Sequence, residues 1–143
     1  MPGPAPSDAP VPSDSEFVFV YGALMRGFDL HHHMAGSLFV SQATGRGRLY
    51  DIGAYPGMIE GDGTVRGELY RFEDIAVALE VLDEVEEYDP LDAAASLYVR
   101  VLRGVRVEKD DSEPPAWLYL YNRDVKGLPQ IRSGDWHKYS QDL

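Results

Sequence analysis

One carboxylate in this sequence falls where carboxylates are rarely found. Residues 75–86 contain neither glycine nor proline, and their hydrophobic residues recur at helical spacing, which predicts a helix with one apolar face. Glu86 comes four residues after Leu82 and lies within that face, among Ile75, Ala78, Leu79, Val81 and Val85. Burial disfavours the charged form of a carboxyl group and raises its pKa toward neutrality, where the group can accept and return a proton. Glu86 is therefore a candidate general acid/base.

Two other interpretations of Glu86 follow from the same pattern. The helix can fray before residue 86, so that the side chain turns into water, or the carboxylate can pair with an arginine. The neighbouring acids need no special explanation, because helical geometry places them on the flank or the solvated side. These acids are Glu80, Asp83, Glu84 and Glu87.

A second candidate element is the stretch from Phe17 to Leu24. A run of hydrophobic residues leads into Gly22, a pattern typical of a buried strand that ends in a sharp turn. With no Cβ, Gly22 can take backbone angles closed to other residues, so the N–H groups of Ala23 and Leu24 can be turned toward a bound group. The turn after Tyr21 is thus a candidate anion pocket built from backbone.

Three further side chains are candidates for the wall of the same cleft. Residues 97–108 alternate as a strand should, which places Tyr98 and Arg100 on one face. A salt bridge to one of the many acids is an equal alternative for Arg100. In the strand predicted at residues 116–122, Tyr121 belongs to the aromatic side, while Trp117 on that side is expected to pack in the core.

Three adjacent histidines, His31, His32 and His33, form the most conspicuous polar run. Neighbouring side chains point in different directions on a helix or a strand, so the three cannot all serve one metal ion. Packing, capping, or one imidazole lining the cleft are the better interpretations. We expect no metal site here.

Charge and composition narrow the classes of partner. The 143 residues contain 24 acidic and 13 basic side chains, for a formal net charge of -11, so phosphate backbones and anionic lipid surfaces are repelled. Neither nucleic acid nor a membrane is an expected partner. Cysteine is absent, which excludes disulfides and a thiolate nucleophile. We expect a cytoplasmic location.

The chain is expected to form one domain after a short tail. Residues 1–15 are rich in proline and lack aromatic residues, which predicts a disordered tail, and residues 16–143 form the domain. A first strand, bent strands, a further strand, one main helix, two more strands and a short tail follow in order. This order predicts an α+β fold whose mixed or antiparallel sheet is curled into a small β-barrel.

Several short blocks, in the same order, resemble the γ-glutamylcyclotransferase-like family, which includes the butirosin-biosynthesis-cyclotransferase-like proteins. Tyr21 to Leu24 resembles the family's loop Tyr-Gly-Ser/Thr-Leu, and Leu82 to Tyr88 resembles its Leu-Asp-x-x-Glu-Gly-Tyr. Further matching blocks are residues 45–51 with 55–57, residues 98–100 and residues 131–136, so that the resemblance spans residues 17–139. Two positions depart from the family pattern: Ala23 has no hydroxyl, and Glu87 replaces the usual glycine.

The resemblance implies the family's barrel fold and its reaction. The α-amino group of a γ-glutamyl unit attacks its own γ-carbonyl and yields 5-oxoproline and a free amine, with no cofactor. Glu86 matches the family's catalytic acid/base. The turn from Tyr21 to Leu24 would hold the glutamyl carboxylate or the developing oxyanion, and Tyr98, Arg100 and Tyr121 would line the cleft for a small γ-glutamyl substrate.

Two alternatives remain at this point. The altered positions Ala23 and Glu87 also suit a noncatalytic module that binds a small acidic metabolite or peptide in the same pocket. A different γ-glutamyl transfer, to the amine of another molecule, is the second.

Overall fold

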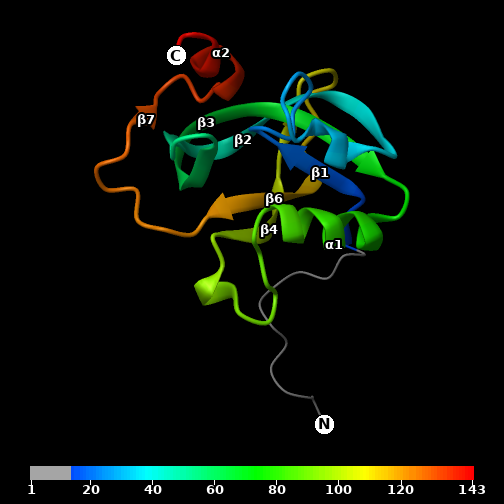
Figure 1. Cartoon of the computed structure of the whole chain (residues 1–143). Helices are drawn as coiled ribbons and strands as arrows, with labels where there is room; N and C mark the ends of the chain where they lie inside the picture. Colours follow the sequence, from blue (N-terminus) through cyan, green and yellow to red (C-terminus); the bar gives the residue numbers. More distant parts are fainter. Residues whose placement is uncertain (1–13) are drawn as a thin grey trace.

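The computed structural model describes residues 14–143 and contains one sheet with α1 packed along it (Figure 1). The strands are β1 (Phe17–Val20), β2 (Ser37–Asp51), β3 (Pro56–Phe72), β4 (Tyr98–Gly104), β5 (Arg106–Val107), β6 (Pro115–Tyr121) and β7 (Gln130–Ile131). The α-helices are α1 (Ile75–Val85) and α2 (Trp136–Gln141), and the short 3-10 helices are η2 (His31–Met34) and η3 (Ala93–Ala95).

The sheet has seven strands in the order β4-β6-β1-β3-β2-β5, with β7 paired to β2. β1 and β6 run parallel, and the other neighbouring pairs are antiparallel. The predicted α+β fold, with a mixed sheet and one main helix, is confirmed.

The expected closure into a barrel is wrong. The hydrogen-bonded path has two ends, β4 and β5, and no ladder joins them within residues 14–143. Only Val105 separates the two strands, so one chain segment pairs with β6 through its first part and with β2 through its last two residues. The sheet is strongly curled because this segment must reach both of its ends.

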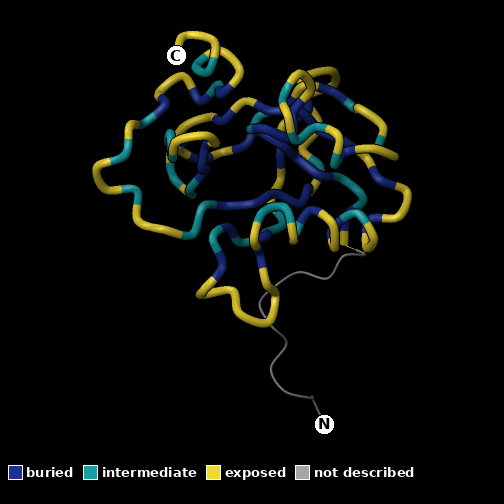
Figure 2. Tube along the Cα trace, in the orientation of Figure 1, coloured by how far each residue is buried: buried dark blue, intermediate teal, exposed yellow. Residues whose placement is uncertain are grey.

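The core lies inside the curled sheet and beneath α1 (Figure 2). Asp74 caps the helix by accepting a hydrogen bond from the Val77 N–H. The apolar face then buries Ile75, Leu79 and Leu82 against the sheet. This packing fixes the direction in which the end of α1 points.

The described chain enters the fold at Ser15. Its hydroxyl donates to the Pro115 carbonyl at 2.7 Å, and its own carbonyl accepts from the Trp117 indole at 2.9 Å. Ser15 is buried and packs with the domain, Asp14 is exposed, and residues 1–13 of the predicted tail lie outside the described residues. No helix within residues 14–143 combines the length and apolar character needed to cross a membrane.

Candidate active site

The end of α1 turns Glu86 away from the helix axis and into the protein. The helix ends at Val85, one residue before the predicted limit, and Glu86 is its C-cap. Glu87 then adopts a left-handed conformation, with φ of 54°. The N–H of Glu87 donates to the Glu84 carbonyl and that of Tyr88 donates to the Asp83 carbonyl, at 3.2 and 2.8 Å. These bonds form a Schellman motif, which satisfies the last carbonyls of the helix.

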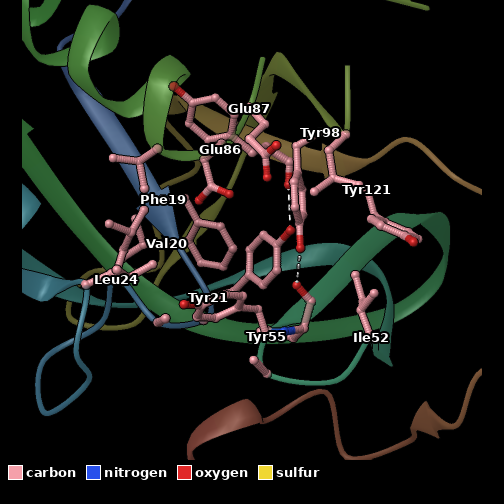
Figure 3. Close-up of a pocket in the computed structure, with 18 residues that line it drawn as sticks. Phe19, Val20, Tyr21, Leu24, Ile52, Tyr55, Glu86, Glu87, Tyr98 and Tyr121 are labelled. Atoms are coloured by element: carbon pink, nitrogen blue, oxygen red, sulfur yellow. Dashed lines mark hydrogen bonds between the residues drawn. The ribbon is translucent and has the colours of Figure 1, made fainter. Parts of the chain in front are cut away.

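Beyond this helix end lies a cavity of about 160 Å³. Glu86 and Glu87 reach it from α1, and the loop that follows β1 forms another part of its wall (Figure 3). The structure brings together most of the predicted site residues here: Tyr21, Gly22, Ala23, Leu24, Glu86, Tyr98 and Tyr121. The wall is completed by Phe19, Val20, Leu30, Ile52, Ala54, Tyr55, Pro56, Val85, Glu87, Leu97 and Tyr119.

Glu86 has the electrostatic setting that the apolar arc predicts. Burial raises its pKa to about 7, and no hydrogen bond or ion pair to its carboxylate occurs within residues 14–143. The lining contains no Lys, Arg or His. Pairing with an arginine is therefore wrong within the described residues, and the half-buried side chain lines the cavity instead of extending into bulk solvent. A carboxyl group with a pKa near 7 can exchange a proton at physiological pH.

The loop after β1 lines the same cavity and contains a tight turn. The Met25 N–H donates to the Gly22 carbonyl at 3.0 Å and closes a tight turn. The N–H groups of Gly22, Ala23 and Leu24 have no acceptor within the described part of the chain. A group in the cavity that carries negative charge could accept from them, as such clustered backbone amides bind anions.

The reason for glycine at position 22 differs from the predicted one. Its φ lies outside the left-handed region that only glycine visits freely. A Cβ at Gly22 would instead lie 2.8 Å from Cγ of Pro56 and 2.9 Å from its Cδ. The glycine is needed for the close approach of the loop to Pro56, the first residue of β3, and Gly22 and Pro56 both line the cavity.

Two of the predicted tyrosines serve as fixed wall elements. The Tyr21 hydroxyl donates to the Tyr119 carbonyl at 2.6 Å and accepts from the Met58 N–H at 3.2 Å. The Tyr98 hydroxyl donates to the Pro56 carbonyl at 2.8 Å. Burial raises the pKa of both Tyr21 and Tyr98 above the usual range, so both remain neutral with their protons committed to backbone oxygens. Tyr121 packs edge-on to Tyr98, with centroids 5.5 Å apart.

Arg100 does not line the cavity, which corrects one of the two interpretations of this residue. Its guanidinium forms a buried salt bridge with Asp83 at 2.6 Å and lies over the Trp117 ring. Asp83 also accepts from the Tyr119 hydroxyl at 2.6 Å. Burial outweighs both partners and raises the pKa of Asp83. The expectation of a flanking or solvated position does not hold for Asp83, whose side chain is only 13% exposed.

Sequence reasoning missed Tyr119 and Tyr55 in the cavity wall. Tyr119 alternates with Trp117 and Tyr121 on the aromatic side of β6, so the same pattern contained it. Tyr55 belongs to a turn before β3, and periodicity carries no information on such a position.

The three histidines lie outside the cavity lining. His31 Nδ1 lies 2.8 Å from the Leu24 carbonyl, and its ring packs 5.8 Å from that of Tyr70. The ring of His32 packs against that of His33. Within residues 14–143, no group of three or more His, Asp or Glu side chains is arranged to hold a metal ion.

Comparison with known proteins places this geometry in a family. The model of the gamma-glutamyl cyclotransferase, AIG2-like family matches residues 18–138. The chain belongs to this family. The gamma-glutamylcyclotransferase family protein YtfP of Escherichia coli (strain K12) is 34% identical over 120 residues, which cover 83% of this chain and 94% of YtfP. A putative gamma-glutamylcyclotransferase of Vibrio cholerae is 33% identical over 125 residues, covering 83% and 93%.

A solved structure supports the same assignment. The solution structure of Escherichia coli YtfP aligns with a TM-score of 0.59 and 32% identity, covering 87% of this chain and 98% of that one.

Within the γ-glutamylcyclotransferase pattern, the two departures have different structural effects. Ala23 removes a hydroxyl but leaves the backbone N–H at the cavity wall. Glu87 takes the left-handed conformation that the usual glycine adopts more easily. It therefore keeps the turn after Glu86 and adds a carboxylate to the wall.

Proposed function

We propose that this protein is a γ-glutamylcyclotransferase-type enzyme that releases 5-oxoproline from a γ-glutamyl amide, with Glu86 as general acid/base. One observation carries the proposal: a single cavity is lined both by a carboxyl group with a pKa of about 7 and by a loop with unpaired backbone donors. Membership in the gamma-glutamyl cyclotransferase, AIG2-like family supports the same chemistry.

The proposed reaction places few demands on the protein because the substrate supplies its own nucleophile. The α-amino nitrogen attacks the γ-carbonyl carbon, and Glu86 takes the proton that this nitrogen loses. The N–H groups of residues 22–24 hold either the developing oxyanion or the glutamyl carboxylate. Glu86 then returns the proton to the leaving nitrogen, the bond from that nitrogen to the γ-carbon breaks, and 5-oxoproline remains. Holding the chain folded for ring closure supplies much of the rate enhancement.

The size of the cavity indicates which part of the substrate it holds. A cavity near 150 Å³ accommodates a ligand about the size of benzene, and this one has about 160 Å³. A whole γ-glutamyl amide is much larger than this, so we propose that the glutamyl half enters the cavity and that the leaving amine extends toward the opening. Specificity for the leaving group therefore belongs to the residues around that opening.

The test is release of 5-oxoproline from a panel of γ-glutamyl amides by the purified full chain. We expect Glu86→Gln to lower kcat/KM by a factor of about 100 or more, because it removes the proton transfer. Glu80→Gln is the matched control, since Glu80 is exposed on the same helix and lies outside the cavity. Thermal unfolding of both variants verifies that each is folded.

Other outcomes distinguish the alternatives. Thermal stabilisation by γ-glutamyl compounds without product would indicate a binding module. A γ-glutamyl adduct with an added competing amine would indicate a transferase that uses an external nucleophile. Equal activity of Glu86→Gln and Glu80→Gln would eliminate Glu86 as the acid/base.

A further inference from the structure

His31 holds the loop after β1 through one of its backbone carbonyls. Its Nδ1 lies 2.8 Å from the carbonyl oxygen of Leu24, and Leu24 lines the cavity. A carbonyl oxygen can only accept, so Nδ1 carries a proton and donates it. His32 makes the same kind of bond to the carbonyl of Asp29, at 2.9 Å, but Asp29 lies outside the lining. The two neighbouring imidazoles thus differ in which part of the chain they hold.

The carbonyls of residues 22–24 each accept a hydrogen bond from the protein. Their donors, in order, are the Met25 N–H at 3.0 Å, the Leu30 N–H at 3.2 Å and the His31 imidazole at 2.8 Å. The first two donors belong to the backbone, whereas His31 donates from its side chain. A substitution can therefore remove the His31 bond and leave the backbone chemistry unchanged.

These bonds fix the direction of the N–H groups in the loop. No peptide bond in the described part of the chain is cis, and in a planar trans peptide the carbonyl of one residue points opposite to the N–H of the next. Holding the carbonyls of Gly22 and Ala23 thus fixes the N–H groups of Ala23 and Leu24, which have no acceptor among the described residues. Rotation of either peptide plane would replace a donor with a carbonyl oxygen, which repels an anion.

The His31 bond supports this arrangement through the peptide between Leu24 and Met25. The carbonyl of that peptide accepts from His31, and its N–H donates to the Gly22 carbonyl. Losing the first bond leaves the plane free to turn, which weakens the second bond. The second bond holds the peptide that carries the Ala23 N–H, so the direction of this N–H depends on His31.

The imidazole is itself held from outside the cavity. The ring centroids of His31 and the buried Tyr70 lie 5.8 Å apart. The Tyr70 hydroxyl donates to Oε1 of the buried Glu68 at 2.8 Å, and the same oxygen accepts from the Arg26 N–H at 2.9 Å. These four side chains lie outside the cavity lining. The loop is thus held on both sides of Met25 by a cluster built on β3.

We infer that His31 is a positioning residue, which holds the loop after β1 so that the N–H groups of Ala23 and Leu24 can bind negative charge on the substrate. The inference rests on the proposed function. His31 exchanges no proton with the substrate: Glu86 moves the proton during ring closure, and the imidazole acts only through the backbone of the loop.

Three variants of the purified full chain test this role by release of 5-oxoproline from a γ-glutamyl amide. His31→Leu removes the donor, whereas His31→Asn keeps an N–H near the position of Nδ1. His32→Leu is the matched control, because it removes the same kind of bond from the same 3-10 helix. We expect kcat/KM to fall by about tenfold to hundredfold in His31→Leu and by no more than about threefold in the other two variants.

A second readout follows the loop directly. 5-Oxoproline is titrated into isotope-labelled protein, and the amide signals of Ala23 and Leu24 are followed by NMR. Both signals should shift in the unaltered chain and in His31→Asn. In His31→Leu the concentration needed for half of the shift should rise by about tenfold, because hydrogen bonds to a charged group are lost. Thermal unfolding verifies that each variant is folded at the temperature of the assay, and a general loss of stability would not raise this concentration.

The possible failures differ. If the unaltered chain cyclises its substrate but His31→Leu keeps full activity, or either of the other variants loses as much, the inference is wrong and the proposed function stands. The inference is also wrong if 5-oxoproline leaves the Ala23 and Leu24 signals of the unaltered chain unshifted. If the unaltered chain releases no 5-oxoproline, the proposed function is wrong, and the inference falls with it.

Discussion

The buried pair of Arg100 and Asp83 allows a sharp test of the packing beneath α1. Their side chains are 7% and 13% exposed and joined at 2.6 Å. The variant Arg100→Met removes the cation and keeps most of the apolar volume beside Trp117. It leaves the Asp83 carboxylate with the Tyr119 hydroxyl as its remaining side-chain partner.

Removing one partner of a buried pair typically costs 3–5 kcal/mol, because the other charge stays buried. The retained hydrogen bond from Tyr119 and the slight exposure of Asp83 reduce this, so we expect Arg100→Met to lower the free energy of unfolding by about 2–4 kcal/mol. Adding Asp83→Asn removes the stranded charge while its amide oxygen still accepts from Tyr119. The double variant should therefore recover about 1–2 kcal/mol of that loss.

The loss of unfolding free energy in Arg100→Met should also depend on pH. Burial already raises the pKa of Asp83, and removing Arg100 withdraws a group that lowers it. A carboxyl with a raised pKa in the folded state stabilises the fold when protonated, and this contribution is lost as pH rises through the folded-state pKa. The deficit of Arg100→Met should thus be largest at neutral pH and should shrink as the solution is made acidic.

Urea unfolding followed by far-UV circular dichroism measures these differences without relying on Trp117, which contacts the altered site. Arg106→Met is the control, because Arg106 and its partner Asp111 are both exposed, and we expect it to cost less than about 1 kcal/mol. Two results would refute the reasoning: a cost of Arg100→Met as small as the control, or a double variant no more stable than the single one.

Three further predictions concern the turn and the loop at the cavity. The pKa of Glu86 is raised to about 7, so ionisation of this carboxyl group destabilises the folded state. Glu86→Gln should therefore be more stable than the parent by about 2–3 kcal/mol above pH 7 and nearly equal to it below pH 5. Urea unfolding at several pH values measures this difference. Glu87→Gly should raise the free energy of unfolding by about 0.5–1 kcal/mol by relieving the left-handed strain, and an unchanged or lower urea midpoint contradicts it. Gly22→Ala should destabilise by about 1–3 kcal/mol because its Cβ would meet Pro56, and a thermal midpoint equal to that of the parent would show that the loop yields freely.

Local patterns were enough to predict α1 and the environment of Glu86. The apolar spacing depends only on residues within the helix, and the structure buries the face that this spacing predicts. The left-handed turn at Glu87 was not predictable in the same way, because glycine usually marks such a turn. Here the packing of Tyr88 and the two Schellman hydrogen bonds hold it in place despite the side chain.

Long-range geometry decided the remaining features. Strand alternation placed Tyr98 and Arg100 on the correct shared face, but α1 covers the part of that face where Arg100 lies and leaves Tyr98 at the cavity. Which part is covered depends on how the helix crosses the sheet, and no spacing along the chain encodes this. Barrel closure likewise depends on whether the two ends of the sheet pair with each other, a relation between β4 and β5 that neither strand reveals alone.

Tyr119 gives the site its rigidity. Its hydroxyl is tied to the last turns of α1 through Asp83, and its carbonyl is tied to the loop after β1 through Tyr21. Tyr119 therefore links the end of α1, where Glu86 lies, to the loop that carries the N–H groups of residues 22–24. A short hydrogen bond makes each of the two connections. A ligand that enters between them meets a gap whose width is already set, so little of its binding energy is lost in closing the protein around it.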